Sequence, residues 1–203
     1  MNQELICLAS ASPRRRQLLE QIGIACEVRP ADIDEFSLPD EPPHDLVRRL
    51  ALSKAEQATV GDRGKRRRLV LAADTVVVLD GKVFGKPTGD SDARDMLRAL
   101  SGRTHEVMTA IAISDNGISH CELSESKVTF GDLTDAQIDS YVASGEPADK
   151  AGAYAIQGMA AVFISRIEGS FSGVMGLPLF ETAALLGRFG VDVMCPSARD
   201  ADA

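Results

Sequence analysis

The stretch LVLAADTVVVL at residues 69–79 restricts the fold more than any other part of the chain. It is nearly all apolar or β-branched, and Asp74 is its one charged residue. Strands that are covered on both faces have such continuous apolar runs, whereas half-exposed strands alternate apolar and polar residues. We therefore predict a central strand here, in which a buried carboxylate at Asp74 needs an ionic, hydrogen-bonding or metal partner.

Further strands are predicted on either side of this one. Asp80-Gly81 and Asn116-Gly117 are strong signals for hairpin turns. The apolar runs predict strands at residues 5–9, 25–29, 82–84, 106–114, 118–130 and 161–167, of which the two longest form an antiparallel ribbon. The glycine-rich segment KAGAYAIQG at residues 150–158 predicts instead a loop that approaches another part of the chain closely.

Five segments carry the signals of helices. Ser12 is placed as an N-cap with Pro13 in the first helical turn, and Thr134 to Gln137 has the form of a capping box. The predicted helices lie at residues 13–22, 44–60, 91–100, from 134 onward, and 178–189. A polar, proline-rich loop at residues 30–43 carries Asp32, Asp34 and Glu35.

Length and charge limit the kinds of protein this can be. A chain of 203 residues fits one folding unit, which we expect to have a cleft. The formal net charge of −8 argues against a protein that coats nucleic acid, although a small anion can still bind a locally positive pocket. The basic run at residues 64–69 favours a solvated loop over a nucleic-acid patch or a targeting signal.

Several common kinds of site have no matching pattern. The cysteines are scattered with no C-x-x-C pair, and the three histidines are isolated, which argues against zinc. Neither G-x-x-x-x-G-K-[ST], G-x-G-x-x-G nor G-x-S-x-G occurs. The sequence has no secretory signal and no apolar run of about 18 residues, so we expect a cytoplasmic protein with no membrane partner.

The stretch LASASPRRR, which begins at Leu8, has the composition of a phosphate site. Ser10 and Ser12 precede a helix whose first turn carries consecutive arginines, so hydroxyls, backbone N–H groups and guanidinium groups meet in one place. Cations at a helix N-terminus oppose the helix dipole, which argues for a function that offsets this cost. We expect Arg14 and Arg15 to bind the anion and Arg16 to face solvent.

Other charged residues extend this prediction. Lys54 and Lys86 are candidates for binding the rest of a triphosphate, although a single lysine is most often a solvated surface charge. Asp74 and Glu35 could together hold Mg²⁺, which takes one or two carboxylates along with phosphate oxygens. The alternative for Asp74 is that it caps a turn. Basic groups, paired carboxylates and phosphate together suggest metal-assisted cleavage of a phosphoanhydride.

Taken together, these motifs resemble the Maf family of nucleoside triphosphate pyrophosphatases. The resemblance rests on their number and order along nearly the whole chain. The matching segments are LASASPRR at 8–15, DE at 34–35, RLALSKA at 49–55, AADTVV at 72–77, GKP at 85–87, LSGRTHEVMTA at 100–110, DKAGAYAIQG at 149–158 and GLPL at 176–179.

The resemblance implies an α/β fold related to the inosine triphosphatases, with a mixed, elongated sheet in two lobes around a central cleft. We expect one such domain over residues 1–194 and a flexible tail over 195–203. The implied reaction converts a nucleoside triphosphate and water to the monophosphate and pyrophosphate, with a divalent cation, Mg²⁺ or Mn²⁺. Asp74 would accept the proton and bind the metal together with Glu35. The implied phosphate ligands are Ser10, Arg14, Arg15, Lys54 and Lys86.

The sequence looks like the subgroup that acts on dTTP, UTP and modified pyrimidine nucleotides. Arg14, Thr75 and Gln157 match the specificity positions of that subgroup, and an amide such as that of Gln157 can complement the edge of uracil or thymine. Two alternatives stay open: a 7-methyl-GTP pyrophosphatase, and a regulatory nucleotide-binding protein linked to septum formation or cell-division arrest. A homodimer is plausible for the family.

Overall fold

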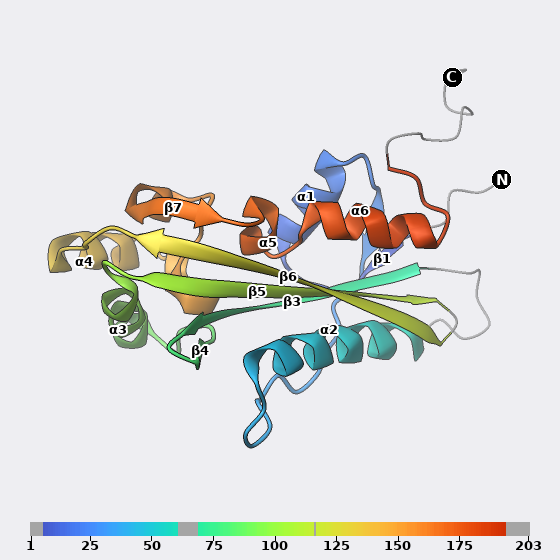
Figure 1. Cartoon of the computed structure of the whole chain (residues 1–203), viewed down its shortest axis with the longest axis horizontal. Coiled ribbons are helices and arrows are strands. Elements are labelled where there is room, and N and C mark those ends of the chain that lie inside the picture. Colours follow the sequence, from blue (N-terminus) through green and yellow to red (C-terminus); the bar gives the residue numbers. More distant parts are fainter. Residues whose placement is uncertain (1–5, 61–68, 116, 194–203) are drawn as a thin grey trace.

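The computed structural model describes residues 6–60, 69–115 and 117–193. Over these residues seven strands form one mixed sheet in the order β2-β1-β3-β5-β6-β7, with β4 paired to β3. The sheet runs along the longest axis of the molecule (Figure 1). The strands are β1 (Ile6–Leu8), β2 (Cys26–Val28), β3 (Leu69–Leu79), β4 (Lys82–Phe84), β5 (Thr104–Asp115), β6 (Ile118–Phe130) and β7 (Ile164–Glu168).

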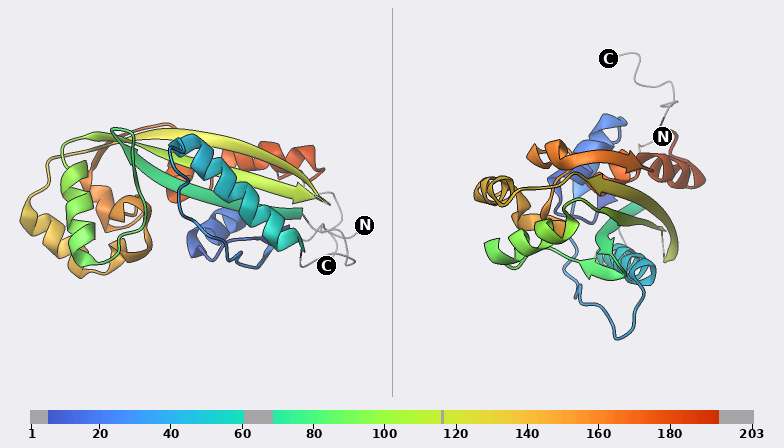
Figure 2. Two further views of the ribbon diagram at one scale, coloured as in Figure 1. Left: turned by 90° about the horizontal axis from the view of Figure 1, so that it is seen from below. Right: turned by 60° about the vertical axis from the view of Figure 1, so that its left-hand side comes forward.

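Helices cover both faces of one end of this sheet and gather at the other end (Figures 1 and 2). At the first end α2 packs on one face, and α1 and α6 pack on the opposite face. The second end carries α3, α4 and the 3₁₀ turns. The helices are α1 (Pro13–Gln21), α2 (Pro43–Val60), α3 (Asp90–Leu100), α4 (Asp135–Ala143), α5 (Phe171–Met175) and α6 (Leu179–Arg188), and the 3₁₀ turns are η1 (Glu146–Asp149), η2 (Ala151–Ala153) and η3 (Met159–Phe163). The predicted α/β class and the mixed, elongated sheet are confirmed.

Strand β3 lies inside the sheet and is covered on both faces, as its composition predicts. Leu69 and Leu71 pack in the core beneath α1 and α6, whereas Val70 and Ala72 pack in the core beneath α2. Ten of its eleven residues are buried. The exception is Thr75, which is partly exposed. The long ribbon is confirmed too, because β5 and β6 pair antiparallel from one end to the other.

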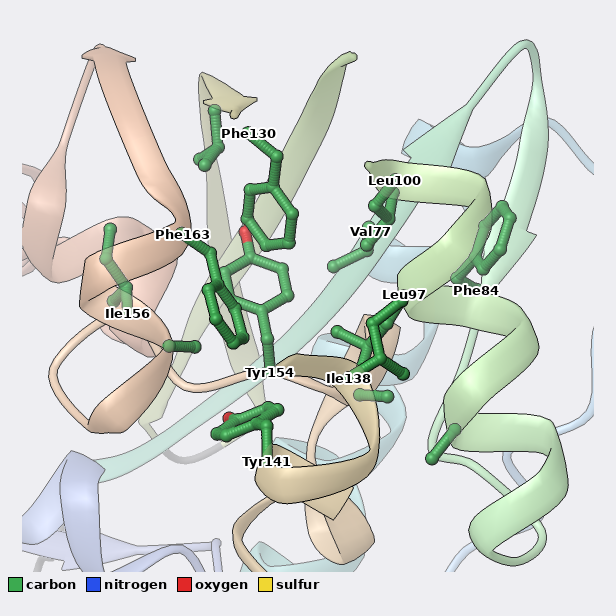
Figure 3. Close-up of a cluster of buried hydrophobic side chains, with 14 of the residues drawn as sticks. Val77, Phe84, Leu97, Leu100, Phe130, Ile138, Tyr141, Tyr154, Ile156 and Phe163 are labelled. Atoms are coloured by element: carbon green, nitrogen blue, oxygen red, sulfur yellow. The ribbon is translucent and has the colours of Figure 1, made fainter. Parts of the chain in front are cut away.

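Aromatic and aliphatic side chains together form the core at the second end (Figure 3). The rings of Phe130 and Tyr154 pack edge to face at 5.0 Å, and those of Tyr141 and Phe163 at 5.3 Å. The Tyr154 hydroxyl lies 2.8 Å from Nε2 of buried His105. This packing fixes the start of the loop that carries Gln157, because Tyr154 belongs to that loop.

The predicted turns agree with the structure where it describes them. Asp80 and Gly81 have φ values of 51° and 76°. This left-handed conformation is the one that the tight hairpin turn between β3 and β4 requires. The Thr134 hydroxyl accepts a hydrogen bond from the Gln137 N–H, and the Gln137 side chain accepts one from the Thr134 N–H, which completes the predicted capping box. The second predicted turn includes residue 116, which lies outside the described residues.

Two predicted elements differ in the structure. The strand predicted at 161–167 begins only at Ile164, because the preceding segment MAAVF turns as η3 and buries Ala160 and Phe163 three residues apart on one side. The five-residue helix α5 is absent from the sequence prediction, because it is too short for a periodic apolar pattern. Within the described ranges, no helix is long and apolar enough to cross a membrane. The basic run at 64–68 and the tail at 195–203 lie outside those ranges.

Candidate active site

The predicted site lies where one edge of β3 has no strand partner. On that edge β3 pairs with β1 through residues 69–71 and with β4 through residues 77–79, while β5 pairs along the opposite edge. Asp74 and Thr75 fall between the two short partners. Consecutive side chains of a strand point to opposite faces, so Asp74 faces α2 and Thr75 faces α1 and α5. The gap places the two side chains at one opening of the sheet edge.

On the α2 face, a lysine lies between two carboxylates. Nζ of Lys54 lies 2.7 Å from Oδ1 of Asp74 and 2.5 Å from Oε1 of Glu35. Lys54 and Asp74 are 8% and 7% exposed. Nζ of Lys86 lies 3.7 Å from Oε2 of Glu35, and the Lys86 side chain is largely exposed. The structure therefore brings together the four predicted residues Glu35, Lys54, Asp74 and Lys86, and it gives Asp74 the ionic partner that its burial requires.

The surroundings of Glu35 are positively charged. Burial by itself would raise the pKa of its carboxyl group, but the hydrogen bond from Lys54 and the charges of Lys54, Lys86 and Arg15 outweigh burial and lower that pKa. Glu35 is therefore ionised at neutral pH. An excess of cations around a carboxylate also suits a polyanion such as a triphosphate.

On the opposite face, the guanidinium group of Arg15 connects three parts of the chain. Its Nε donates to the Gly176 carbonyl at 2.7 Å, Nη1 donates to Ser10 Oγ at 3.0 Å, and Nη2 donates to Thr75 Oγ1 at 3.1 Å. Burial lowers the pKa of Arg15 and the charge of Asp74 opposes this shift. An arginine has five N–H donors, so two remain after these three bonds. Arg15 thus orients two neighbouring hydroxyl groups and keeps donors for a ligand.

The hydroxyl group of Ser10 is set up as a donor. Its oxygen accepts hydrogen bonds from Arg15 and from the Ser12 N–H, the latter at 3.3 Å. A serine hydroxyl has two lone pairs and one proton, so both acceptor positions are filled. No acceptor for its proton lies among the described residues. Ser10 can therefore donate to an anion at the start of α1, as the sequence predicts.

The first helical turn of α1 presents its arginines to different surroundings. Arg16 is more than half exposed and pairs with Glu20 at 3.2 Å, so it faces solvent as predicted. Arg14 makes no hydrogen bond or ion pair with another described residue. Burial lowers the pKa of Arg14, while the charges of Asp149 and Glu146 raise it. Arg14 therefore reaches from the first end of the sheet toward η1 at the second end with its guanidinium group unpaired.

Gln157 lies on a loop that is held firmly to α4. The Tyr141 hydroxyl donates to Oε1 of Glu146 at 2.8 Å and accepts from the Ala155 N–H at 3.1 Å. Oε2 of Glu146 accepts from the Met159 N–H at 3.1 Å, on the other side of Gln157. The Gln157 side chain is exposed and makes no hydrogen bond with another described residue. Its amide is thus free while the backbone on both sides of it is fixed.

The predicted close approach of this loop is made by Gly152. Its φ is 68°, and a Cβ atom there would lie 2.9 Å from Cγ2 of Val77 in β3. Both the backbone conformation and the space require glycine. The loop is therefore pressed against the part of β3 that comes after Asp74 and Thr75.

A family model described as Maf-like protein matches residues 5–189. The chain belongs to the Maf family. Its relatives include proteins named dTTP/UTP pyrophosphatase. One from Anaeromyxobacter dehalogenans is 56% identical over 91% of this chain and 94% of its own length. One from Chromobacterium violaceum is 52% identical over 95% and 98%, and one from Nitrosomonas europaea is 51% identical over 93% and 96%.

In this Maf chain, the motif residues form two connected groups rather than one. Glu35, Lys54, Asp74 and Lys86 are in contact on the α2 face, and Ser10, Arg15 and Thr75 are in contact on the α1 face. Arg14 and Gln157 join neither group through a hydrogen bond between described residues. A depression of about 380 Å³ beside α6, lined by residues 183, 187 and 190–193, shares no residue with either group.

Sequence reasoning did not single out three residues that support this Maf site. Gly176 accepts the hydrogen bond from Arg15 Nε and has a φ of 110°, a conformation that favours glycine. Oγ1 of Thr109 in β5 lies 2.9 Å from Oγ1 of Thr75 in the neighbouring strand β3. Glu146 accepts a hydrogen bond from the loop that carries Gln157. Thr109 and Gly176 fall within quoted motifs, but a threonine in an apolar strand carries no signal of its own because threonine is common in strands.

Proposed function

We propose that this chain hydrolyses dTTP and UTP, and modified pyrimidine relatives, to the nucleoside monophosphate and pyrophosphate. The observation that carries the proposal is the contact of Lys54 with both Asp74 and Glu35 at the unpaired edge of β3, beside the arginines of α1. Its relatives of more than 50% identity over nearly the full length bear the name of this activity.

The cations would bind the triphosphate. Ser10 would donate its hydroxyl proton to a phosphate oxygen, and Arg14 would use its unpaired guanidinium group. Arg15 would add its two remaining N–H donors. The other phosphates of the substrate would contact Lys86 and Lys54. Lys86 is exposed, and Lys54 bridges the two carboxylates. Charge on the departing pyrophosphate would thereby be stabilised as it develops.

Glu35 and Asp74 suit a divalent cation such as Mg²⁺ or Mn²⁺. Each has a carboxylate oxygen in contact with the same Lys54 nitrogen, so the two carboxylates converge on one position. No group of three or more His, Cys, Asp or Glu side chains within the described ranges could hold a metal ion. Two carboxylates with further oxygens from phosphate and water are typical of Mg²⁺. A bound cation would supply charge stabilisation to the phosphates.

Asp74 would accept the proton of the attacking water. Its Oδ1 accepts a hydrogen bond from Lys54, which orients the carboxylate, and Oδ2 makes no hydrogen bond with another described residue. A general base must lie within hydrogen-bond reach of the proton it removes, and Oδ2 is the oxygen that remains for a water molecule. Thr75, Arg14 and Gln157 would contribute to the choice of nucleotide.

Pyrophosphate release from dTTP, UTP, CTP, dATP, GTP and 7-methyl-GTP tests this proposal, with Mg²⁺ or Mn²⁺ present and the nucleotide product identified. We expect dTMP and UMP as products. Asp74→Asn should lose turnover by about 100-fold or more while it still binds nucleotide, and Asp139→Asn on exposed α4 is the matched control. Turnover of 7-methyl-GTP alone would contradict the choice of substrate. Tight binding with no turnover would favour the regulatory alternative.

A further inference from the structure

The ammonium group of Lys54 occupies the position on which the two carboxylates of the proposed metal site converge. Its Nζ lies 2.7 Å from Oδ1 of Asp74 and 2.5 Å from Oε1 of Glu35. Lys54 and Asp74 are both more than nine-tenths buried. The lysine is therefore itself the cation that these two oxygens share in the nucleotide-free protein.

A second cation cannot share this position with Lys54. Two cations in contact with the same pair of oxygens would lie against each other, and their repulsion is strong where water is largely excluded. Lys54 must therefore leave both carboxylates before a metal ion can bridge them, and breaking a buried ion pair is costly. Lys86 stands apart from this position, because its side chain is exposed and its Nζ lies 3.7 Å from the other oxygen of Glu35, Oε2.

The charge of the site also opposes a metal ion that arrives alone. The positive charges of Lys54, Lys86 and Arg15 all act on the carboxylate of Glu35, and Asp74 supplies the second negative charge. Three positive charges against two negative charges leave an excess of one. A divalent cation would enlarge this excess, whereas the negative charge of a triphosphate would offset it.

We propose that Lys54 excludes the divalent cation from Asp74 and Glu35 in the nucleotide-free protein, and that it releases the two carboxylates when it turns to the phosphates. Nucleotide and cation then bind cooperatively, because both favour the displaced position of Lys54, and by linkage each raises the affinity for the other by the same factor. The inference rests on the proposed function, since it concerns the order in which the same substrate and cation bind.

Titration of the nucleotide-free protein with Mn²⁺ measures this competition, with the EPR signal of free Mn²⁺ as the readout. Lys54→Met removes the ammonium group, and we expect it to raise the affinity for Mn²⁺ by about tenfold or more. Lys86→Met is the matched control, because it also removes a positive charge beside Glu35 but leaves Lys54 between the carboxylates. It should raise the affinity by about threefold or less. Adding Asp74→Asn to Lys54→Met should abolish the gain.

Equal affinities of the wild-type, Lys54→Met and Lys86→Met proteins for Mn²⁺ would overturn the inference, as would a gain that persists without Asp74. If Lys54→Met does not fold, crystals of the wild-type protein grown with Mn²⁺ decide. We expect Mn²⁺ between the carboxylates only where Nζ of Lys54 has moved more than about 4 Å from Oδ1 of Asp74. Mn²⁺ that bridges both carboxylates with Nζ still in place would overturn the inference.

These measurements contain no nucleotide, so they are independent of the turnover assay. Turnover of dTTP and UTP by a protein that fails the Mn²⁺ tests would overturn the inference and leave the proposed function intact. Competition between Lys54 and Mn²⁺ in a protein that hydrolyses no nucleotide would overturn the proposed function, and with it the role of the phosphates in releasing Lys54.

Discussion

Replacing Lys54 with methionine removes the cation between Asp74 and Glu35 and keeps an unbranched side chain of similar length. Loss of one partner from a buried ion pair typically costs about 3–5 kcal/mol, because the other charge stays buried without compensation. Asp74 is 7% exposed, so it has little access to water. Glu35 is nearly half exposed, so water compensates more of its charge when the lysine is removed. We expect Lys54→Met to lower the free energy of unfolding by about 3 kcal/mol, the lower end of this range.

Urea unfolding followed by circular dichroism measures this change, with EDTA present so that metal binding does not contribute. A double-mutant cycle separates the pair from its parts, because Lys54→Met combined with Asp74→Asn removes both charges. The double variant should be more stable than Lys54→Met alone by about 2 kcal/mol. Arg94→Met is the control, since its partner Asp139 is largely exposed, and it should cost about 0.5 kcal/mol or less.

Additivity in this cycle would refute the reasoning. If Lys54→Met and Asp74→Asn destabilise the protein independently, the cost of losing Lys54 comes from packing and not from an uncompensated carboxylate. A loss no larger than that of Arg94→Met would likewise mean that water or other groups already compensate Asp74. Either result would remove the physical basis for treating Lys54 as the residue that orients the Asp74 carboxylate.

Two further predictions concern the second end of the sheet. Burial lowers the pKa of His105 to about 4, so the unfolded chain binds its proton first as the pH falls. The contribution of neutral His105 to the free energy of unfolding should therefore be fully present above pH 6.5. Between pH 6.5 and 4 it should decline by about 1.4 kcal/mol per pH unit, about 3 kcal/mol in all. Urea unfolding across that range checks this, and His105→Leu should lack that part of the pH dependence. Gly152→Ala meets both a positive φ and the side chain of Val77, so thermal unfolding should show a loss of about 2–4 kcal/mol, whereas Gly187→Ala, with open space, should show none.

Features that depend on local composition can be predicted well from the sequence. The run at 69–79 predicts a doubly covered strand because burial on both faces demands apolar residues at every position. The turn at Asp80-Gly81 and the capping box at Thr134 depend on a few adjacent residues and are confirmed. The prediction for 161–167 is wrong over its first three residues because small and apolar residues such as those of MAAVF suit a 3₁₀ turn as well as a strand, and tertiary packing decides between them.

The sequence indicates a contact of the site only where a charged residue stands in an otherwise apolar segment. Asp74 is recognisable because a carboxylate in an apolar strand needs a partner, yet nothing local indicates that the partner is Lys54, twenty residues earlier. Thr109 lacks any such signal. Its contact with Thr75 arises from the register of β3 and β5, which sets the two threonines opposite each other, and α5 presents a carbonyl to it. Register is a property of the assembled sheet.

The unpaired interval of β3 explains how one strand can contribute neighbouring residues to one site. Asp74 and Thr75 point to opposite faces, so within a continuous sheet the strands on either side would separate them. Because β1 ends at Leu8, opposite Leu71, and β4 ends at Phe84, opposite Val77, the edge between their pairing regions is free of strands and both faces meet there. The carboxylate group of the α2 face and the hydroxyl group of the α1 face therefore both lie beside this free edge. The brevity of β1 and β4 thus opens the sheet edge at which the proposed site lies.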